Sequence, residues 1–145
     1  MPEKRTVEKA RKAKRAGKAP STQAGEFVRE EIRHIRRGKH GARSTQQAIA
    51  IGLSKARRAG VALPAPKKGK AKASTRKSAA YAYAAGQHKR KPRRQPRVSR
   101  AVSEVLKREP RDTASSKALA SQTKRTTARR AATRKAAGTK ARQGK

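Results

Sequence analysis

The feature that most constrains the fold of this chain is its shortage of bulky apolar side chains. Val, Ile, Leu and Phe together account for 15 of the 145 residues, whereas Ala alone accounts for 29. A highly charged chain with less than about 20% of such residues buries too little apolar surface to offset the entropy of ordering every segment. A single compact core through the whole chain is therefore excluded. We expect a mostly α-helical, partly disordered protein.

The basic residues are spread unevenly. In total, 43 Lys and Arg stand against 8 Asp and Glu, a formal net charge of +35. Two tracts, 67–97 and 113–145, hold 12 and 10 bases without a single acid, and they are almost devoid of bulky apolar residues. Most acids and most bulky apolar residues fall instead in 21–66 and 98–112. We expect the packed helices there.

Residues 21–63 are predicted to form a small antiparallel helical hairpin. In its first helix, apolar residues at positions 27, 28, 32 and 35 follow helical spacing. Ser21 or Thr22 is the expected N-cap, and Gly38 is the expected end of the helix. The predicted core of the whole hairpin is Phe27, Val28, Ile32, Ile35, Ile49, Leu53, Ala56 and Val61.

The second helix of the hairpin is expected to begin after Ser44. The spacing from Ser44 to Gln47 is that of a capping box. In this motif the side chain of each of the two residues accepts a hydrogen bond from the backbone amide of the other. Gly60 is expected to end the helix in a left-handed conformation. Gly52 lies inside it, so that either the first helix approaches closely there or the second helix is weak.

A short third helix is predicted over 98–109. Val98, Val102, Val105 and Leu106 form one apolar stripe, which we expect to dock on the hairpin. The other segments are expected to be flexible basic arms. They comprise an N-terminal arm or frayed helix over 1–20, a Pro- and Ala-rich linker over 64–97 and an Ala-rich tail over 110–145. Within them, 67–80 and 123–145 are predicted to be solvated coil that becomes helical when phosphates neutralise the charge.

The sequence gives no support for catalysis. His34, His40 and His88 lack the partners of a known metal or acid–base motif, and His34 with His40 would supply two metal ligands without an evident third. We therefore predict no catalytic residue, no cofactor, no metal site and no small-molecule substrate. No run of 18 apolar residues and no secretory signal is present, so we expect no membrane partner and a cytoplasmic location.

The expected partner is a polyphosphate. At one phosphate per 1.7 Å of duplex, 35 charges would match roughly 60 Å of DNA. The predicted contacts lie in the acid-free tracts: Lys67, Lys68, Lys70, Lys72, Arg76, Lys77, Lys89, Arg90, Lys91, Arg93, Arg94, Arg97, Lys124, Arg125, Arg129, Arg130, Arg134 and Lys135.

Direct sequence readout is not predicted. Gln46 and Gln47 are expected to cap their helix rather than read bases. Tyr81 and Tyr83 are too few to indicate single-strand binding by stacking. The Pro-stiffened strip 89–97 either inserts arginines into a narrow minor groove or is a charged linker.

The segment GKHGARSTQQAIAIGLSKARRAG, residues 38–60, resembles the core of a family of small basic bacterial proteins with a domain of unknown function. The resemblance covers residues 1 to about 70 and implies a bacterial cytoplasmic setting with DNA association. The remainder is similar in composition to the Lys- and Ala-rich tails of linker histones, although Arg here outnumbers Lys by 23 to 20.

These observations lead to the hypothesis of a nonenzymatic, histone-like and nucleoid-associated protein that binds double-stranded DNA without sequence specificity and compacts or bridges it. One alternative is association with RNA or the ribosome, because Arg-rich arms that fold on RNA have the same composition. Another is a scaffold that binds an acidic protein through the hairpin. The hairpin would also permit self-association.

Overall fold

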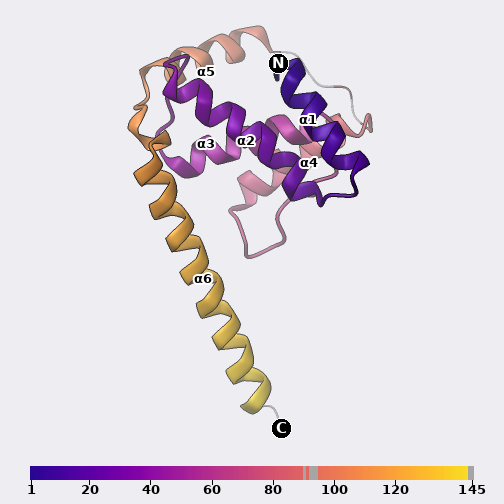
Figure 1. The fold of residues 1–145 in the computed structure, drawn as a ribbon, viewed down its shortest axis with the longest axis vertical. Helices are drawn as coiled ribbons and strands as arrows, with labels where there is room; N and C mark the ends of the chain where they lie inside the picture. The colour runs from indigo at the N-terminus through magenta and orange to yellow at the C-terminus, as the bar shows by residue number, and fades with distance from the viewer. Residues whose placement is uncertain (90, 92–94, 144–145) are drawn as a thin grey trace.

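The structure, a computed structural model, describes residues 1–89, 91 and 95–143. Every regular element in these ranges is a helix, which confirms the mostly α-helical fold class. In Figure 1, α1 to α4 form a compact body, α5 lies across one end of it, and α6 extends away to the C-terminus. The elements are α1 (Lys4–Arg15), α2 (Pro20–Arg36), α3 (Thr45–Arg58), α4 (Ala73–Gly86), α5 (Pro96–Arg108), the 3₁₀ turn η1 (Asp112–Ala114) and α6 (Ser116–Gln143).

The predicted hairpin is present as α2 and α3. Phe27 and Ala56 share a buried cluster at one end, and Ile35 and Ala48 share a second cluster at the other, so the two helices run antiparallel. Five predicted core residues are buried: Phe27, Ile32, Ile35, Ala56 and Val61. The other three are half-buried: Val28, Ile49 and Leu53.

The two helix starts follow different rules. Ser44 caps α3 as predicted, because its Oγ accepts a hydrogen bond from the Gln47 amide at 3.1 Å. The Gln47 Oε1 accepts from the amide of Arg43 at 2.7 Å, one residue before the position of an ordinary capping box. The predicted Ser21 or Thr22 cap of α2 is wrong. That helix begins at Pro20, whose preset φ and missing N–H suit the first turn, and Ala19 is its N-cap.

The N-terminal segment packs as part of the body. Helix α1 lies against α2, with Thr6 and Ala10 buried at 3% and 5% exposure. Just before the helix, the Glu3 amide donates to Glu30 Oε2 at 3.1 Å. The sequence predicts an arm or frayed helix over 1–20, because Lys and Arg are interleaved with Ala there. Small side chains nevertheless permit close packing.

The docking predicted for the third helix is wrong. Helix α5 forms, but Val98, Val102 and Val105 are 54%, 51% and 58% exposed, and α5 packs on no other helix in the described part of the chain. The end of the hairpin is covered instead by Ala114 of η1, which is fully buried, and by Leu119 of α6. These two residues occupy the apolar surface that the valine stripe would need.

The two stretches expected as coil, 67–80 and 123–145, are helical at 73–80 within α4 and at 123–143 within α6. Alanine has the highest helix propensity, and the interleaved like charges do not overcome it here. Helix α4 also packs on α3 through Ala79, Ala82 and Gly86. A Cβ at Gly86 would lie 1.7 Å from the carbonyl oxygen of Arg57, so only glycine permits this contact. Among the described helices, none combines the length and apolarity needed to cross a bilayer.

The choice left open for Gly52 is settled by close packing. A Cβ built there would lie 2.7 Å from the Cα of Val28, a backbone atom that cannot move aside. We expect Gly52→Ala to destabilise the hairpin by about 1–3 kcal/mol despite the better helix propensity of Ala. Gly25→Ala in α2 is the matched control, since a Cβ there has nothing within 4 Å, and it should stabilise by up to about 1 kcal/mol. Urea denaturation followed by circular dichroism measures both; equal stabilisation would contradict the close contact.

Candidate nucleic-acid interface

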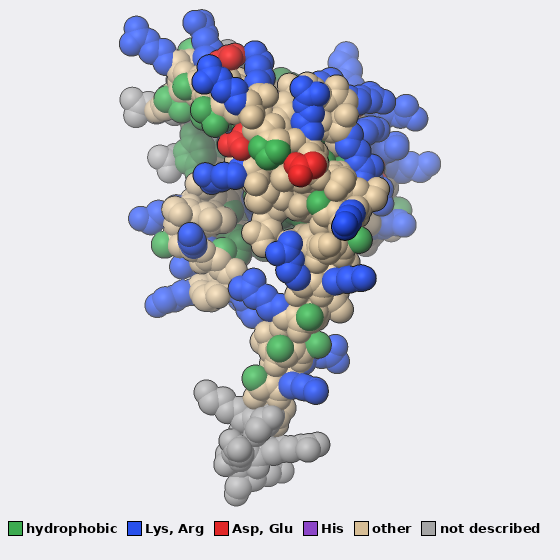
Figure 2. All heavy atoms as spheres, turned by 90° about the vertical axis from the view of Figure 1, so that its left-hand side faces the viewer, with side chains coloured by type: hydrophobic (Ala, Val, Ile, Leu, Met, Phe, Trp, Pro, Cys, Tyr) green, Lys and Arg blue, Asp and Glu red, His purple; other side chains and the backbone are tan. Residues whose placement is uncertain are grey.

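Helix α6 carries basic side chains on all its sides. It has 28 residues, about 42 Å at 1.5 Å per residue, and no acid. Six of its basic residues form three adjacent pairs that recur every five residues. Five residues of α-helix rotate by about 140°, so successive pairs point in different directions. Figure 2 shows Lys and Arg side chains on both sides of the extending helix. The exposed bases predicted to bind phosphate are Lys124, Arg125, Arg129, Arg130, Arg134 and Lys135.

Two of the predicted basic tracts meet at α6. A shallow groove of about 670 Å³ is lined on one side by Gly69 and Lys70 from the loop before α4. Its other side is formed by α6, which contributes Arg129, Arg130 and Arg134. The linker and the tail, treated as independent arms in the sequence analysis, therefore supply four cations to one concave surface.

A second basic groove lies between α3 and α4. Its volume is about 740 Å³, and Arg58, Lys77 and Tyr81 are among its lining residues. Arg58 was missed by sequence reasoning because it lies in the hairpin rather than in an acid-free tract. Arg58 lies in the same groove as Lys77 because α4 packs on α3.

The other predicted contacts are dispersed. Lys67, Lys68 and Lys72 are exposed in and just after the loop, and Arg76 is half-exposed in α4. Lys89 and Lys91 are exposed in the segment before α5, and Arg97 is exposed in the first turn of α5. Arg90, Arg93 and Arg94 lie outside the described residues, and so does Pro92 of the proposed minor-groove strip. Gln47 is engaged in the cap of α3 and Gln46 is exposed.

Part of the negative charge is held inside the body. Glu30 and Glu31 have fully buried side chains in α2. Lys55 of α3 reaches between them, with its Nζ 2.5 Å from Glu31 Oε2 and 3.9 Å from Glu30 Oε1. These acids therefore lie beside an internal cation, away from the exposed basic residues of α4 and α6.

Glu3 is half-buried at the edge of this group. Its Oε1 lies 2.9 Å from His34 Nε2. This hydrogen bond is the main reason that the pKa of the Glu3 carboxyl is lowered, and the charges of Arg33 and Lys39 lower it further. Arg33 and Lys39 approach Glu3 at 3.8 and 3.9 Å. The acid thus joins the N-terminus to the end of α2.

Not every arginine is a candidate contact. Arg57 is 7% exposed, donates through Nε to the Leu63 carbonyl at 3.0 Å and through Nη2 to the Pro64 carbonyl at 3.2 Å. Burial lowers the pKa of its guanidinium. Arg57 therefore fastens the loop after α3 and is excluded from the interface, although Arg58 beside it is exposed.

Comparison of the chain with protein-family models, with curated protein sequences and with solved structures finds no match. The resemblances drawn from residues 1 to about 70 and from the Ala-rich tail stay predictions. The case for a function therefore depends on the geometry and charge of the basic surfaces.

Proposed function

We propose that the protein is a nonenzymatic DNA-binding protein that binds the duplex through its phosphates, without sequence specificity, and compacts or bridges DNA. The observation that carries the proposal is α6, an acid-free helix about 42 Å long with exposed Lys and Arg on all sides. It projects from a body whose buried acids are already paired internally.

A helix with Lys and Arg side chains on every side suits a DNA groove, because phosphates line both edges of the groove. The major groove of B-DNA is about 12 Å wide and admits an α-helix, whose diameter with side chains is about 10–12 Å. A helix lying there reaches both phosphate strands, so that its opposite faces are both used. A helix adapted to a membrane surface would instead need one apolar face. That face is missing, since charged residues interrupt every side of α6.

Bridging is supported by the presence of a second basic surface. The groove with Arg58 and Lys77 is formed by the body, whereas α6 leaves the body. One molecule would therefore hold two duplex segments. Mixing two differently labelled duplexes with the protein should bring the labels together in one complex. A chain that lacks 123–145 but keeps Leu119 on the hairpin should bind one label at a time.

The primary test is a salt titration of binding to two unrelated duplexes of equal length, followed by fluorescence anisotropy. Both should give the same affinity, and the logarithm of the affinity should fall linearly with the logarithm of salt concentration, by about 0.9 per phosphate neutralised. A strong preference for one sequence, or an affinity that barely changes with salt, contradicts the proposal. Tighter binding to a structured RNA at matched phosphate concentration would favour the RNA alternative.

A further inference from the structure

Glu31, His34 and His40 form a cluster that the interface does not use. Glu31 and His34 come from α2, and His40 comes from the loop that joins α2 to α3. Glu31 is fully buried, His34 is 8% exposed, and the side chain of His40 is 18% exposed. One possible metal-ligand atom from each residue lies within 4.8 Å of the others.

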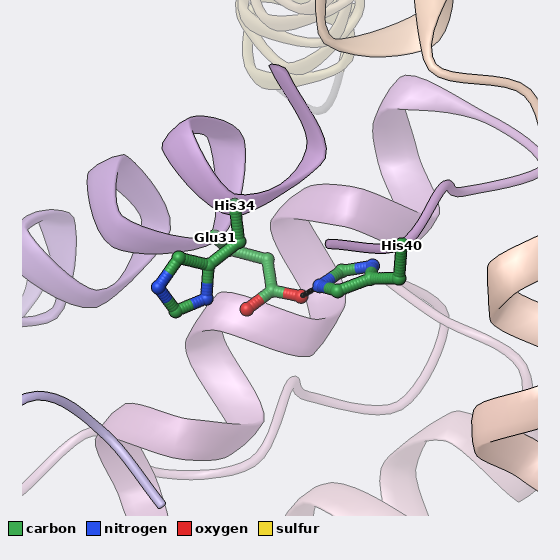
Figure 3. Close-up of side chains that lie close together, drawn as sticks. All are labelled: Glu31, His34 and His40. Carbon is green, nitrogen blue, oxygen red and sulfur yellow. Dashed lines mark ion pairs between the residues drawn. The ribbon is translucent and has the colours of Figure 1, made fainter. Parts of the chain in front are cut away.

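The rings are oriented for a common centre. Figure 3 shows the Glu31 carboxylate between the two imidazoles, with one ring nitrogen of each histidine turned toward it. The Nε2 of His40 is 3.0 Å from Glu31 Oε1, and the two rings stand at 81° with their centroids 6.5 Å apart. Neither Glu31 oxygen has a hydrogen bond of good geometry within the described structure, although Lys55 and His40 lie at ion-pair distance.

The outer nitrogens of both rings are already held. His34 Nε2 lies 2.9 Å from the Glu3 carboxylate, and His40 Nδ1 lies 3.0 Å from the Gly41 carbonyl. Metal-binding histidines almost always donate their second ring N–H to a carboxylate or a backbone carbonyl, which fixes the tautomer and the ring orientation. Both kinds of support are present here.

We propose that Glu31, His34 and His40 bind a divalent transition metal ion, with Zn²⁺ as the expected ion. Two imidazole nitrogens and one carboxylate oxygen are a ligand set typical of Zn²⁺ and of neighbouring transition metals, whereas Mg²⁺ and Ca²⁺ prefer all-oxygen sites. Glu31 would bind through Oε1, because Lys55 is paired with Oε2. The inference does not rest on DNA binding.

Occupation requires a local adjustment. Tetrahedral Zn²⁺ with bonds of about 2.0–2.1 Å holds its ligand atoms about 3.3 Å apart. The ligand atoms of the cluster lie within 4.8 Å of one another, so the widest pair must close by at most about 1.5 Å. The Glu31 to His40 contact of 3.0 Å is already close to that spacing. His34 is held in α2, whereas His40 lies in the loop between α2 and α3, so His40 is the ligand that would move. The ion would then join this loop to the end of α2.

The test is a calorimetric titration of the full chain, stripped with a chelator, with zinc chloride in a buffer that binds no metal. We expect one Zn²⁺ per chain and a higher thermal midpoint in its presence. His40→Ala should abolish both effects, and circular dichroism will show that this loop variant folds. His88→Ala is the matched control, because His88 is exposed and outside the cluster, and it should bind as the unaltered chain does.

A second variant separates a metal site from chance binding by histidines. Glu3→Gln removes the carboxylate behind His34 and leaves all three ligands in place, so Zn²⁺ affinity should fall by about 10–100-fold. Co²⁺ in place of Zn²⁺ should give the visible absorption of a low-coordinate site in the unaltered chain and lose it in His40→Ala. Binding without one-to-one saturation, or equal affinity of the unaltered chain and His40→Ala, would overturn the proposal.

Discussion

Replacing Arg125, Arg129, Arg130 and Arg134 of α6 by Gln is expected to lower DNA affinity by about three orders of magnitude at 0.1 M salt. Each phosphate contact contributes about 0.9 to the salt slope, so four lost contacts reduce that slope by up to about 3.6. All four side chains are exposed on a helix without acids. Fluorescence anisotropy at several salt concentrations measures both quantities, and circular dichroism checks that α6 still forms, since Gln is a good helix former.

The matched control keeps the charge and changes the chemistry. Arg→Lys at the same four positions should leave the salt slope unchanged and alter the affinity little. Nonspecific binding depends on the number of positive charges, whereas bidentate recognition of guanine needs the planar guanidinium. A large loss in the Lys variant would show that these arginines read bases. An unchanged slope in the Gln variant would show that α6 does not contact DNA.

Lys55→Met is expected to lower the free energy of unfolding by about 3–5 kcal/mol. The change leaves the buried Glu30 and Glu31 carboxylates without the cation that lies between them, and an uncompensated buried charge is among the most costly defects in a core. Typical domains are stable by only about 5–15 kcal/mol, so much of the population would unfold on mild heating. Denaturant unfolding in the presence of a chelator provides the measurement.

Two further variants make the Lys55 result specific. Arg58→Met removes an exposed base from the same helix and should change stability by at most about 0.5 kcal/mol. Adding Glu30→Gln and Glu31→Gln to Lys55→Met should recover a substantial part of the loss, because the uncompensated charges are then gone. If Lys55→Met and Arg58→Met were equally mild, the internal ion pairs would not contribute to stability.

Local patterns in the sequence were sufficient for the elements with strong signals. The apolar spacing of Phe27, Ile32 and Ile35 predicted α2, and Ser44 with Gln47 predicted the start of α3. Each of these signals acts within one or two helical turns, so it is readable without knowledge of the fold. The predicted N-cap of α2, Ser21 or Thr22, was wrong because Pro20 takes the first helical position and places the N-cap at Ala19.

Contacts between small residues could not be read in the same way. Ala10, Ala79 and Ala114 look like low-complexity sequence, yet each is buried in the structure. Alanine is compatible with an exposed helix, a buried helix and a coil, and only the neighbouring surface determines which occurs. The valine stripe of α5 shows the converse, since a clear apolar pattern remains exposed when Ala114 and Leu119 have taken its place.

For the candidate sites too, the sequence predicted the residue types but not which residues lie close together. The density of Lys and Arg in the acid-free tracts follows from the sequence, and so does the expectation of a phosphate partner. The sequence did not indicate that Lys70 would share a groove with Arg129 and Arg130. It also presented His34 and His40 as two ligands without a third.

The sequence by itself therefore determined the charge, the helical class and the hairpin, because composition and short-range periodicity act through local propensity and apolar burial. Tertiary structure alone decided which charges are inside and which face solvent. The packing of α2 on α3 brings Lys55 to Glu31, and the loop between them brings His40 to the same carboxylate. Interactions between charges fall steeply with distance and rise with burial, so their roles depend on neighbours that the order of residues does not reveal.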